Sequence, residues 1–251
     1  MTTSTGETGT PVTHEVELGR LVRAVEGSGR HAWAGRAATL PLRKLWLKVT
    51  HEGIENVPSS GGVIVAANHL AFIDSLLLMY ALPRPMNFLG KSEYLDHPIA
   101  RHLFPATGMM PLDRSGKRAR VTLDRAQTVL ESGGIIGVHP EGTRSRDGML
   151  APAHKGVAQM ALRANVPVVP VGIVGTGKVQ PVGQLIPSFQ GEVTVRWGAP
   201  IGLGPWANRR RSATSRRELT NEIMTAISAL SGQPRRETES VTSPVNEPVT
   251  Q

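Results

Sequence analysis

Residues 63–75 read VIVAANHLAFIDS, and this stretch changes character halfway along its length. The first five residues are small or β-branched and apolar, a pattern typical of a strand buried on both faces. Asn68 and His69 follow at once, and Asp74 comes five residues after His69. A buried polar side chain costs free energy unless it has a partner, so these residues either satisfy one another or carry out chemistry.

Short apolar runs of the same kind recur and alternate with helical patterns. The predicted strands are Val63–Ala67, Met86–Gly90, Gly134–Val138, Val166–Val174 and Val193–Trp197. The predicted helices are Ser75–Ala81, Pro98–Phe104, Lys117–Ser132, Gly156–Ala164 and Ser215–Leu230. This alternation predicts an α/β fold with a mixed, mostly parallel central sheet flanked by helices. Ligand sites in such sheets collect where strands end, which is where Asn68 and His69 fall.

Charge is distributed unevenly along the 251 residues. The net charge of +8 and a pI near 10.6 indicate an acidic partner, such as nucleic acid, anionic lipid or a phosphorylated ligand. Between Arg30 and Lys48 there are basic residues but no acid, and Trp and Leu are interleaved with them. A second basic cluster, Arg209–Arg211 and Arg216–Arg217, follows Trp206. Such segments are typical of helices that lie on an anionic membrane surface, although a solvated helix face has the same composition.

Composition excludes several classes of protein. The chain has no cysteine, which excludes disulfides, thiolate nucleophiles and cysteine metal sites. No apolar run approaches the roughly 20 residues that cross a bilayer, and the first residues lack the pattern of a secretory signal. We therefore expect a cytosolic protein that associates with membranes only at their surface.

The chain is expected to form one domain between two polar ends. Residues 1–13 and 231–251 are predicted to be a disordered N-terminus and a disordered tail, because both are rich in small polar residues. Residues 14–230 form the predicted domain. Within it we expect a basic amphipathic, membrane-surface helical segment (14–50), a catalytic core (51–205) and a C-terminal helix (206–230).

His69 and Asp74 can meet only if the chain turns between them. On a straight helix residues five apart lie about 140° apart, so the two side chains would diverge. We predict that the strand ends near Ala67 and that a helix begins near Asp74, with Asp74 as its N-terminal cap. A carboxylate on one imidazole nitrogen fixes the tautomer and leaves the other nitrogen to accept a proton. Such a pair suits deprotonation of a hydroxyl. The same spacing also fits a structural histidine at a strand end, whose hydrogen bond to Asp74 only satisfies its polar ring.

Four further stretches follow in order. They are GKSEY (residues 90–94), GMMPLDRSG (108–116), HPEGTRS (139–145) and VPVVPVGI (166–173). Together with N-H-x4-D, the sequence resembles the lysophosphatidate acyltransferases of the glycerolipid acyltransferase superfamily, from about Trp46 to Ile201. The resemblance implies the glycerol-3-phosphate acyltransferase-like fold. The sequence departs from the family pattern at His139, where an aromatic residue usually precedes Pro-Glu-Gly. We expect the His139 ring to fill the same space.

The resemblance also implies roles for individual residues. His69 is similar to the general base and Asp74 to its orienting partner, and the hydroxyl then attacks a thioester directly. The implied acceptor-binding residues are Asn68, Lys91, Arg114, Glu141, Gly142, Thr143 and Arg144. Arg114 is similar to the arginine that binds the acceptor phosphate, Lys91 is expected to assist it, and Arg144 is a further phosphate candidate. Asn68 is expected to support the loop. Taken singly, Arg114 could pair with a surface acid, Lys91 could be a loop lysine, and Glu141-Gly142 could be a simple turn.

The implied function is transfer of a fatty acyl group from acyl-CoA or acyl carrier protein to a lysophosphatidic-acid-like acceptor, giving phosphatidic acid. No metal or other cofactor is expected, since the thioester is already activated. The expected location is the cytoplasmic face of the cell membrane, as a peripheral protein on an anionic surface. Glycerol 3-phosphate, another lysophospholipid or a glycolipid are alternative acceptors within the superfamily.

Other classes of protein fit less well. Residues 172–178 have the G-x4-G-K spacing of a phosphate-binding loop, but Val179 stands where Ser or Thr must hold magnesium. A serine hydrolase would need a G-x-S-x-G motif, which the sequence lacks. A zinc enzyme would need clustered ligands, and the eight histidines are not spaced as metal ligands. A basic nucleic-acid- or membrane-binding module without catalysis would explain the charge. The sequence shows no nucleic-acid docking motif, and its aromatic content is only 4%.

Overall fold

The computed structural model describes residues 48–91, 108–112, 116–184, 187–188, 191–209 and 212–236. Several predictions lie outside these residues: the disordered N-terminus, the membrane-surface segment up to residue 47, the helix Pro98–Phe104, and Arg114. Residues 237–251 of the predicted tail also lie outside them.

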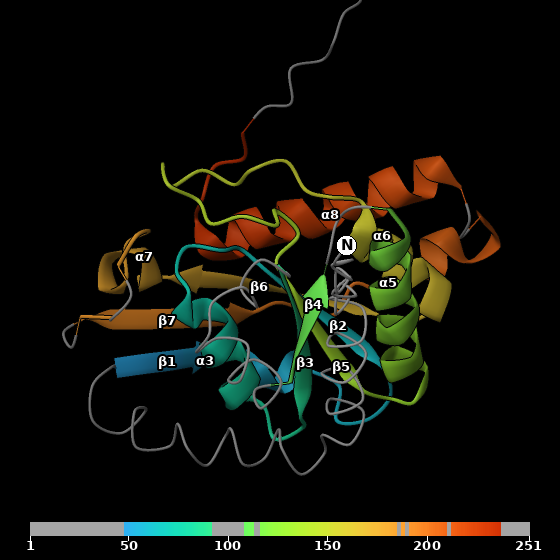
Figure 1. Cartoon of the computed structure of the whole chain (residues 1–251), viewed down its shortest axis with the longest axis horizontal. Helices are drawn as coiled ribbons and strands as arrows, with labels where there is room; N and C mark the ends of the chain where they lie inside the picture. Colours follow the sequence, from blue (N-terminus) through green and yellow to red (C-terminus); the bar gives the residue numbers. More distant parts are fainter. Residues whose placement is uncertain are drawn as a thin grey trace, which may run out of the picture.

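One seven-stranded sheet forms the centre of the described structure (Figure 1). Its order is β1-β7-β6-β2-β5-β3-β4. The strands are β1 (Lys48–Glu52), β2 (Val63–Ala67), β3 (Met86–Lys91), β4 (Met109–Leu112), β5 (Ile135–Val138), β6 (Val168–Val174) and β7 (Glu192–Trp197). Every neighbouring pair is parallel except β6 and β7, which are antiparallel. The predicted mixed, mostly parallel sheet is confirmed.

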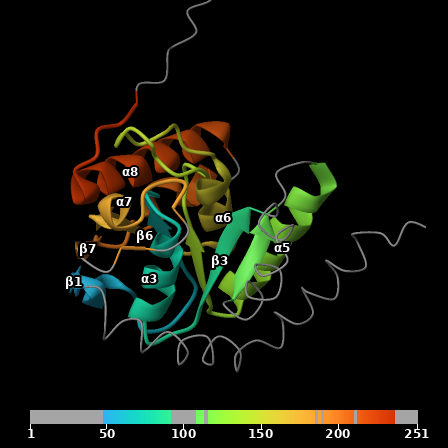
Figure 2. The same ribbon diagram turned by 60° about the vertical axis from the view of Figure 1, so that its left-hand side comes forward.

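Helices cover both faces of this sheet (Figure 2). They are α3 (Ile73–Ala81), α5 (Gly116–Glu131), α6 (Gly156–Ala164), α7 (Thr176–Val179) and α8 (Ala213–Ser231), with 3-10 turns at Ile54–Asn56 and Gly204–Arg209. Side chains of the buried strand β2 alternate between two cores. Ile64 and Ala66 pack with α5, α6 and α8, whereas Val63, Val65 and Ala67 pack with α3. This double burial explains why β2 is apolar at every position, and it places the end of β2 in the middle of the sheet edge.

The N-terminal boundary of the predicted core is wrong by a few residues. Lys48–Thr50, assigned to the membrane-surface helical segment, belong to β1, which pairs in parallel with β7. Burial alternates along β1, with Lys48, Thr50 and Glu52 exposed. Five residues with one polar face give too weak a period-two signal to separate from the basic stretch before them. The edge strand β4 was missed because Pro111 interrupts its short apolar run.

The C-terminal assignments also need correction. The helix predicted at Ser215–Leu230 is confirmed by α8, which begins after the cap Ser212, whose Oγ accepts from Thr214 and Ser215 N–H. The segment assigned to it, however, was drawn from residue 206, and Gly204–Arg209 form a 3-10 turn instead. The predicted disordered tail from residue 231 is packed as far as residue 236. Ser231 and Gln233 are both buried, at 8% and 7% exposed. Polar composition predicted disorder, whereas these polar groups find partners inside the protein.

Candidate active site

A tight turn between β2 and α3 brings His69 and Asp74 together. The Nδ1 of His69 lies 3.0 Å from Oδ2 of Asp74, as the predicted turn requires. The same oxygen accepts the backbone N–H groups of Leu70 at 2.6 Å and Ala71 at 2.8 Å. Asp74 is not the N-terminal cap: Phe72 has that place, and Asp74 is the second residue of α3. Its carboxylate reaches back and holds the turn that carries the imidazole.

The charge of Asp74 fixes the tautomer of His69. Burial acts to raise the pKa of Asp74, but the His69 hydrogen bond, the nearby imidazoles and the Ala71 N–H outweigh it and hold the pKa below its usual value. An ionised carboxylate only accepts hydrogen bonds, so Nδ1 of His69 carries the proton. Nε2 of His69 is then the ring nitrogen able to take a proton from a substrate.

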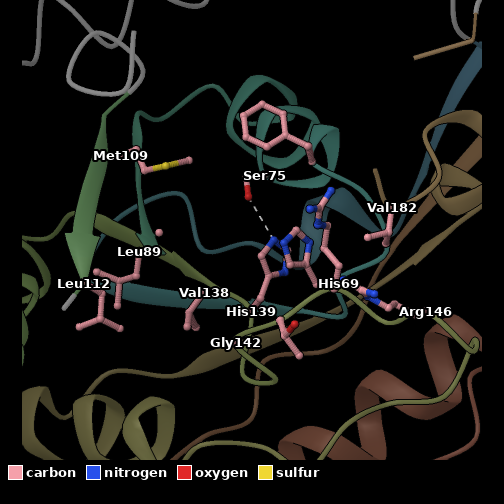
Figure 3. A pocket seen from close by; sticks show the side chains of 14 residues that line it. His69, Ser75, Leu89, Met109, Leu112, Val138, His139, Gly142, Arg146 and Val182 are labelled. Atoms are coloured by element: carbon pink, nitrogen blue, oxygen red, sulfur yellow. Dashed lines mark hydrogen bonds between the residues drawn. The ribbon is translucent and has the colours of Figure 1, made fainter. Parts of the chain in front are cut away.

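The His139 ring stacks on the ring of His69, with centroids 3.8 Å apart and planes within 5° (Figure 3). Its Nδ1 donates to the Ala67 carbonyl at 3.0 Å, and Ser75 Oγ lies 3.1 Å from its Nε2. Burial is the largest influence on His139 and lowers its pKa to about 3. The ring is therefore neutral at physiological pH, and its Nε2 accepts a hydrogen bond from the Ser75 hydroxyl. The His139 ring is packed against its neighbours as expected for the aromatic residue of the family pattern. Its hydrogen bond to Ser75 was not predicted from the sequence.

Glu141 is buried and connects two loops. One carboxylate oxygen accepts the backbone N–H of His69 at 3.0 Å, and the other accepts that of Ala151 at 2.8 Å. Burial raises the pKa of Glu141 to about 7, against the opposing effect of these two bonds. The Ser145 N–H also donates to the His69 carbonyl, at 2.7 Å. Both oxygens of Glu141 thus hold the backbone of the protein, in contrast to the acceptor contact assigned from the sequence.

Asn68 has no exposed surface and makes its contacts within the protein. Its Oδ1 accepts the Ile173 N–H at 2.6 Å, and its Nδ2 donates to the Ile173 carbonyl at 2.9 Å. The same Nδ2 donates to Oε1 of Gln233 at 2.6 Å. Asn68 therefore supports the loop, as expected, and its assignment among the acceptor-binding residues is not supported by its position in the structure.

A pocket of about 220 Å³ opens beside the two stacked rings (Figure 3). The predicted residues on its wall are His69, Gly142, Thr143 and Arg144. The other lining residues are Phe72, Ser75, Leu89, Gly90, Met109, Leu112, Val138, His139, Arg146 and Val182. Lys91 is the last residue of β3, directly after Gly90 of the wall. Figure 3 shows apolar Leu89, Leu112 and Met109 on one side of the rings and Arg146 on the other.

Two residues of this wall escaped the sequence analysis for different reasons. Arg146 was not among the predicted site residues, although the spacing R-x-R after the Glu-Gly pair was a usable signal. Ser75 follows Asp74 directly and offered no signal, because its importance comes from a contact with a residue 64 positions away.

The fold and the site together define a class of α/β protein. Its sheet presents a histidine at the strand ends, oriented by a carboxylate and lying between an apolar wall and arginines. The family model for Acyltransferase matches residues 48–174, half of the chain. The chain belongs to the acyltransferase family.

Relatives in that family carry more specific names. The chain is 34% identical over 170 residues to the chloroplastic 1-acyl-sn-glycerol-3-phosphate acyltransferase BAT2 of Brassica napus, covering 64% of this chain and 49% of that protein. It is 32% identical over 136 residues to the 1-acyl-sn-glycerol-3-phosphate acyltransferase of Borreliella burgdorferi, covering 53% and 54% of the two chains. The chain spans about half the length of the curated relatives it matches.

A solved structure is similar over most of the chain. It is that of the 1-acyl-sn-glycerophosphate acyltransferase PlsC from Thermotoga maritima, with a TM-score of 0.59 and 26% identity, covering 87% of this chain and 81% of the other. Among the helices that the structure describes, none is both long and apolar enough to pass through a bilayer. The described residues contain no group of three or more His, Asp or Glu side chains placed to hold a metal ion.

Proposed function

We propose that the chain transfers a fatty acyl group from a thioester to the free hydroxyl of a lysophosphatidic-acid-like acceptor, giving phosphatidic acid. The observation that carries this proposal is the 3.0 Å bond between His69 Nδ1 and buried Asp74, which leaves Nε2 as the proton acceptor on the pocket wall. The names of the relatives supply the acceptor class.

In this proposal the acceptor hydroxyl donates its hydrogen bond to Nε2 of His69. As the hydroxyl oxygen attacks the thioester carbonyl, its proton passes to Nε2, and Asp74 stabilises the imidazolium that forms. The tetrahedral intermediate collapses with cleavage of the carbon–sulfur bond. The departing thiolate then takes the proton back from His69, so the enzyme ends the cycle unchanged.

Direct attack is favoured over a covalent acyl-enzyme. The chain has no cysteine, and among the described residues that line the pocket Ser75 is the one serine. Its O–H donates a hydrogen bond to His139 Nε2, and the pKa of His139 is lowered to about 3 by burial. Such a weakly basic imidazole is a poor acceptor for the proton of a nucleophile, so Ser75 is not activated for attack.

The two sides of the pocket suit the two parts of the acceptor. Arg144 and Arg146 offer guanidinium groups, which bind phosphate oxygens in two places. Leu89, Met109 and Leu112 offer an apolar surface for an acyl chain on the other side. Lys91 and Arg114 remain predicted phosphate ligands, carried over from the family motif.

The donor and the setting are further parts of the proposal. Acyl-CoA and acyl carrier protein both present a thioester, and no metal or other cofactor is required for its transfer. We place the protein at the cytoplasmic face of the membrane, held by the basic residues of segment 30–48 against anionic lipid. Lys48 is left out of that contact, since it pairs with Glu192 across the sheet edge at 2.6 Å.

The test is an assay of the purified chain with a labelled acyl-CoA and, separately, a labelled acyl carrier protein. The acceptors are lysophosphatidic acid, glycerol 3-phosphate, lysophosphatidylcholine and a glycolipid, each with wild type and His69→Ala. We expect labelled phosphatidic acid from wild type only. Transfer to another acceptor would correct the acceptor class. If neither protein transfers the label to any acceptor and both are retained on DNA in a salt-sensitive way, the acyltransferase proposal is refuted and a binding module without catalysis is favoured.

A further inference from the structure

Five residues after α8, Gly232–Arg236, lie against the loops of the site and are called here the C-terminal strap. Gly232 ends the helix with φ +73°, a left-handed conformation that glycine adopts without strain, and its N–H donates to the Ser228 backbone carbonyl at 2.9 Å. The Ser228 hydroxyl donates to the Gln233 carbonyl at 2.6 Å, and the Gln233 N–H donates to Ser231 Oγ at 3.2 Å. These bonds fix the direction in which the Gln233 side chain leaves the strap.

The Gln233 amide lies between two segments of the site. Its Oε1 accepts from Asn68 Nδ2 at 2.6 Å, and its Nε2 donates to the Gly148 carbonyl at 2.9 Å. Asn68 Nδ2 has two hydrogens, of which the Ile173 carbonyl takes one and Gln233 the other. Loss of the Gln233 oxygen would leave a fully buried N–H without its partner, directly before the proposed base His69.

The rest of the strap holds the loop that contacts His69 from the other side. The Leu150 N–H donates to the Pro234 carbonyl at 2.8 Å, and the Arg236 N–H donates to the Leu150 carbonyl at 2.9 Å. The Arg236 guanidinium pairs with Asp147. The same loop contains Ser145, whose N–H donates to the His69 carbonyl at 2.7 Å. The strap is therefore connected to His69 both through Asn68 and through this loop.

We infer that Gln233 is a positioning residue for His69: its amide holds Asn68 and the Gly148 loop in the arrangement that places the imidazole on Asp74 and toward the pocket. The residue lies outside the matched family region, 48–174, and acts without touching substrate. The inference rests on the proposed function, because it assigns Gln233 to the same base. Small displacements of a reacting group reduce turnover about 10- to 100-fold, and the loss appears in kcat rather than in KM.

The experiment compares Gln233→Ala and Gln233→Met with wild type in the acyl-transfer assay. Met retains the length of the side chain and its packing but removes both hydrogen bonds. The Gln233→Met variant therefore tests the positioning role even if the Ala variant does not fold. Arg235→Ala is the matched control on the same strap, since its guanidinium bonds Asn221 and Thr225 on α8. We expect kcat about 10- to 100-fold lower in the folded Gln233 variant, with KM changed less than about threefold, and wild-type kinetics in the control.

A second readout requires no substrate. The downfield proton resonance of His69 Nδ1–H reports its bond to Asp74, and we expect it to shift or broaden in the Gln233 variants and to persist in Arg235→Ala. Wild-type kcat together with an unchanged resonance in a Gln233 variant would overturn the inference. Equal losses in the Gln233 and Arg235 variants would also overturn it, because they would indicate general loosening of the strap. Absence of transfer by wild type would instead refute the proposed function, while the resonance would still test the positioning.

Discussion

The turn at residues 68–74 and the loop at residues 139–150 meet at His69, but they are built in different ways. The turn is local: one carboxylate oxygen of Asp74 binds the His69 ring and two backbone N–H groups three and four residues before it. The loop depends on contacts distant in sequence, from Glu141 to His69 and from Gln233 to Gly148, which are 72 and 85 residues apart. In the proposed reaction, the turn supplies the imidazole and the carboxylate, and the loop holds the backbone of His69 in place.

The largest expected effect belongs to the turn. His69→Ala removes the proposed proton acceptor, and we expect kcat to fall about 1,000-fold while the variant remains folded. His51→Ala is a suitable control, because His51 lies on the edge strand β1 and bonds the Trp197 indole. Turnover and thermal unfolding of both variants are the measurements. Wild-type turnover by His69→Ala would show that the base lies elsewhere.

The next effect separates the pocket wall from the base. Arg144→Ala and Arg146→Ala each remove a guanidinium from the pocket, and we expect KM for lysophosphatidic acid to rise about tenfold with a smaller change in kcat. Arg163→Ala is the control, since Arg163 pairs with Asp124 at the surface. An uncharged monoacylglycerol acceptor should be insensitive to these arginines. Equal effects on both acceptors would argue against a phosphate contact.

A third prediction concerns the loop and pH. The pKa of Glu141 is raised to about 7 by burial, from an ordinary value of 4.5. The folded protein therefore holds this proton more tightly than the unfolded chain, so the stability that the proton supplies is complete below pH 4.5 and is lost as pH rises through about 7. Glu141→Gln carries no such proton, and the fall in its free energy of unfolding between these pH values should be smaller. Parallel pH profiles for the two proteins would mean that Glu141 titrates normally.

The smallest effect is expected at the stacked ring. His139→Phe keeps the stacking on His69 but removes the bonds to Ala67 and Ser75, so we expect a stability loss of about 1 kcal/mol and a change in kcat below about threefold. Chemical denaturation and steady-state kinetics measure both. A loss of turnover as large as that of His69→Ala would mean that His139 takes part in proton transfer.

The contrast between turn and loop also explains what the sequence could predict. The apolar run before Asn68, the spacing of His69 and Asp74 and the Glu-Gly-Thr-Arg segment are contiguous patterns, so the sheet, the turn and part of the pocket were predicted. The inward orientation of Glu141 and the burial of Asn68 depend on contacts with the distant backbone of His69 and Ile173, which no local pattern records. For the same reason the strap was mistaken for a disordered tail.

A double-mutant cycle on the turn tests the central claim most directly, because it asks whether His69 and Asp74 act as one unit. The kcat of wild type, His69→Ala, Asp74→Asn and the double variant is measured with the same thioester and acceptor. If Asp74 acts only through the imidazole, the double variant is no slower than His69→Ala. Losses that multiply, so that the double variant is slower by the product of the two single effects, would contradict the account.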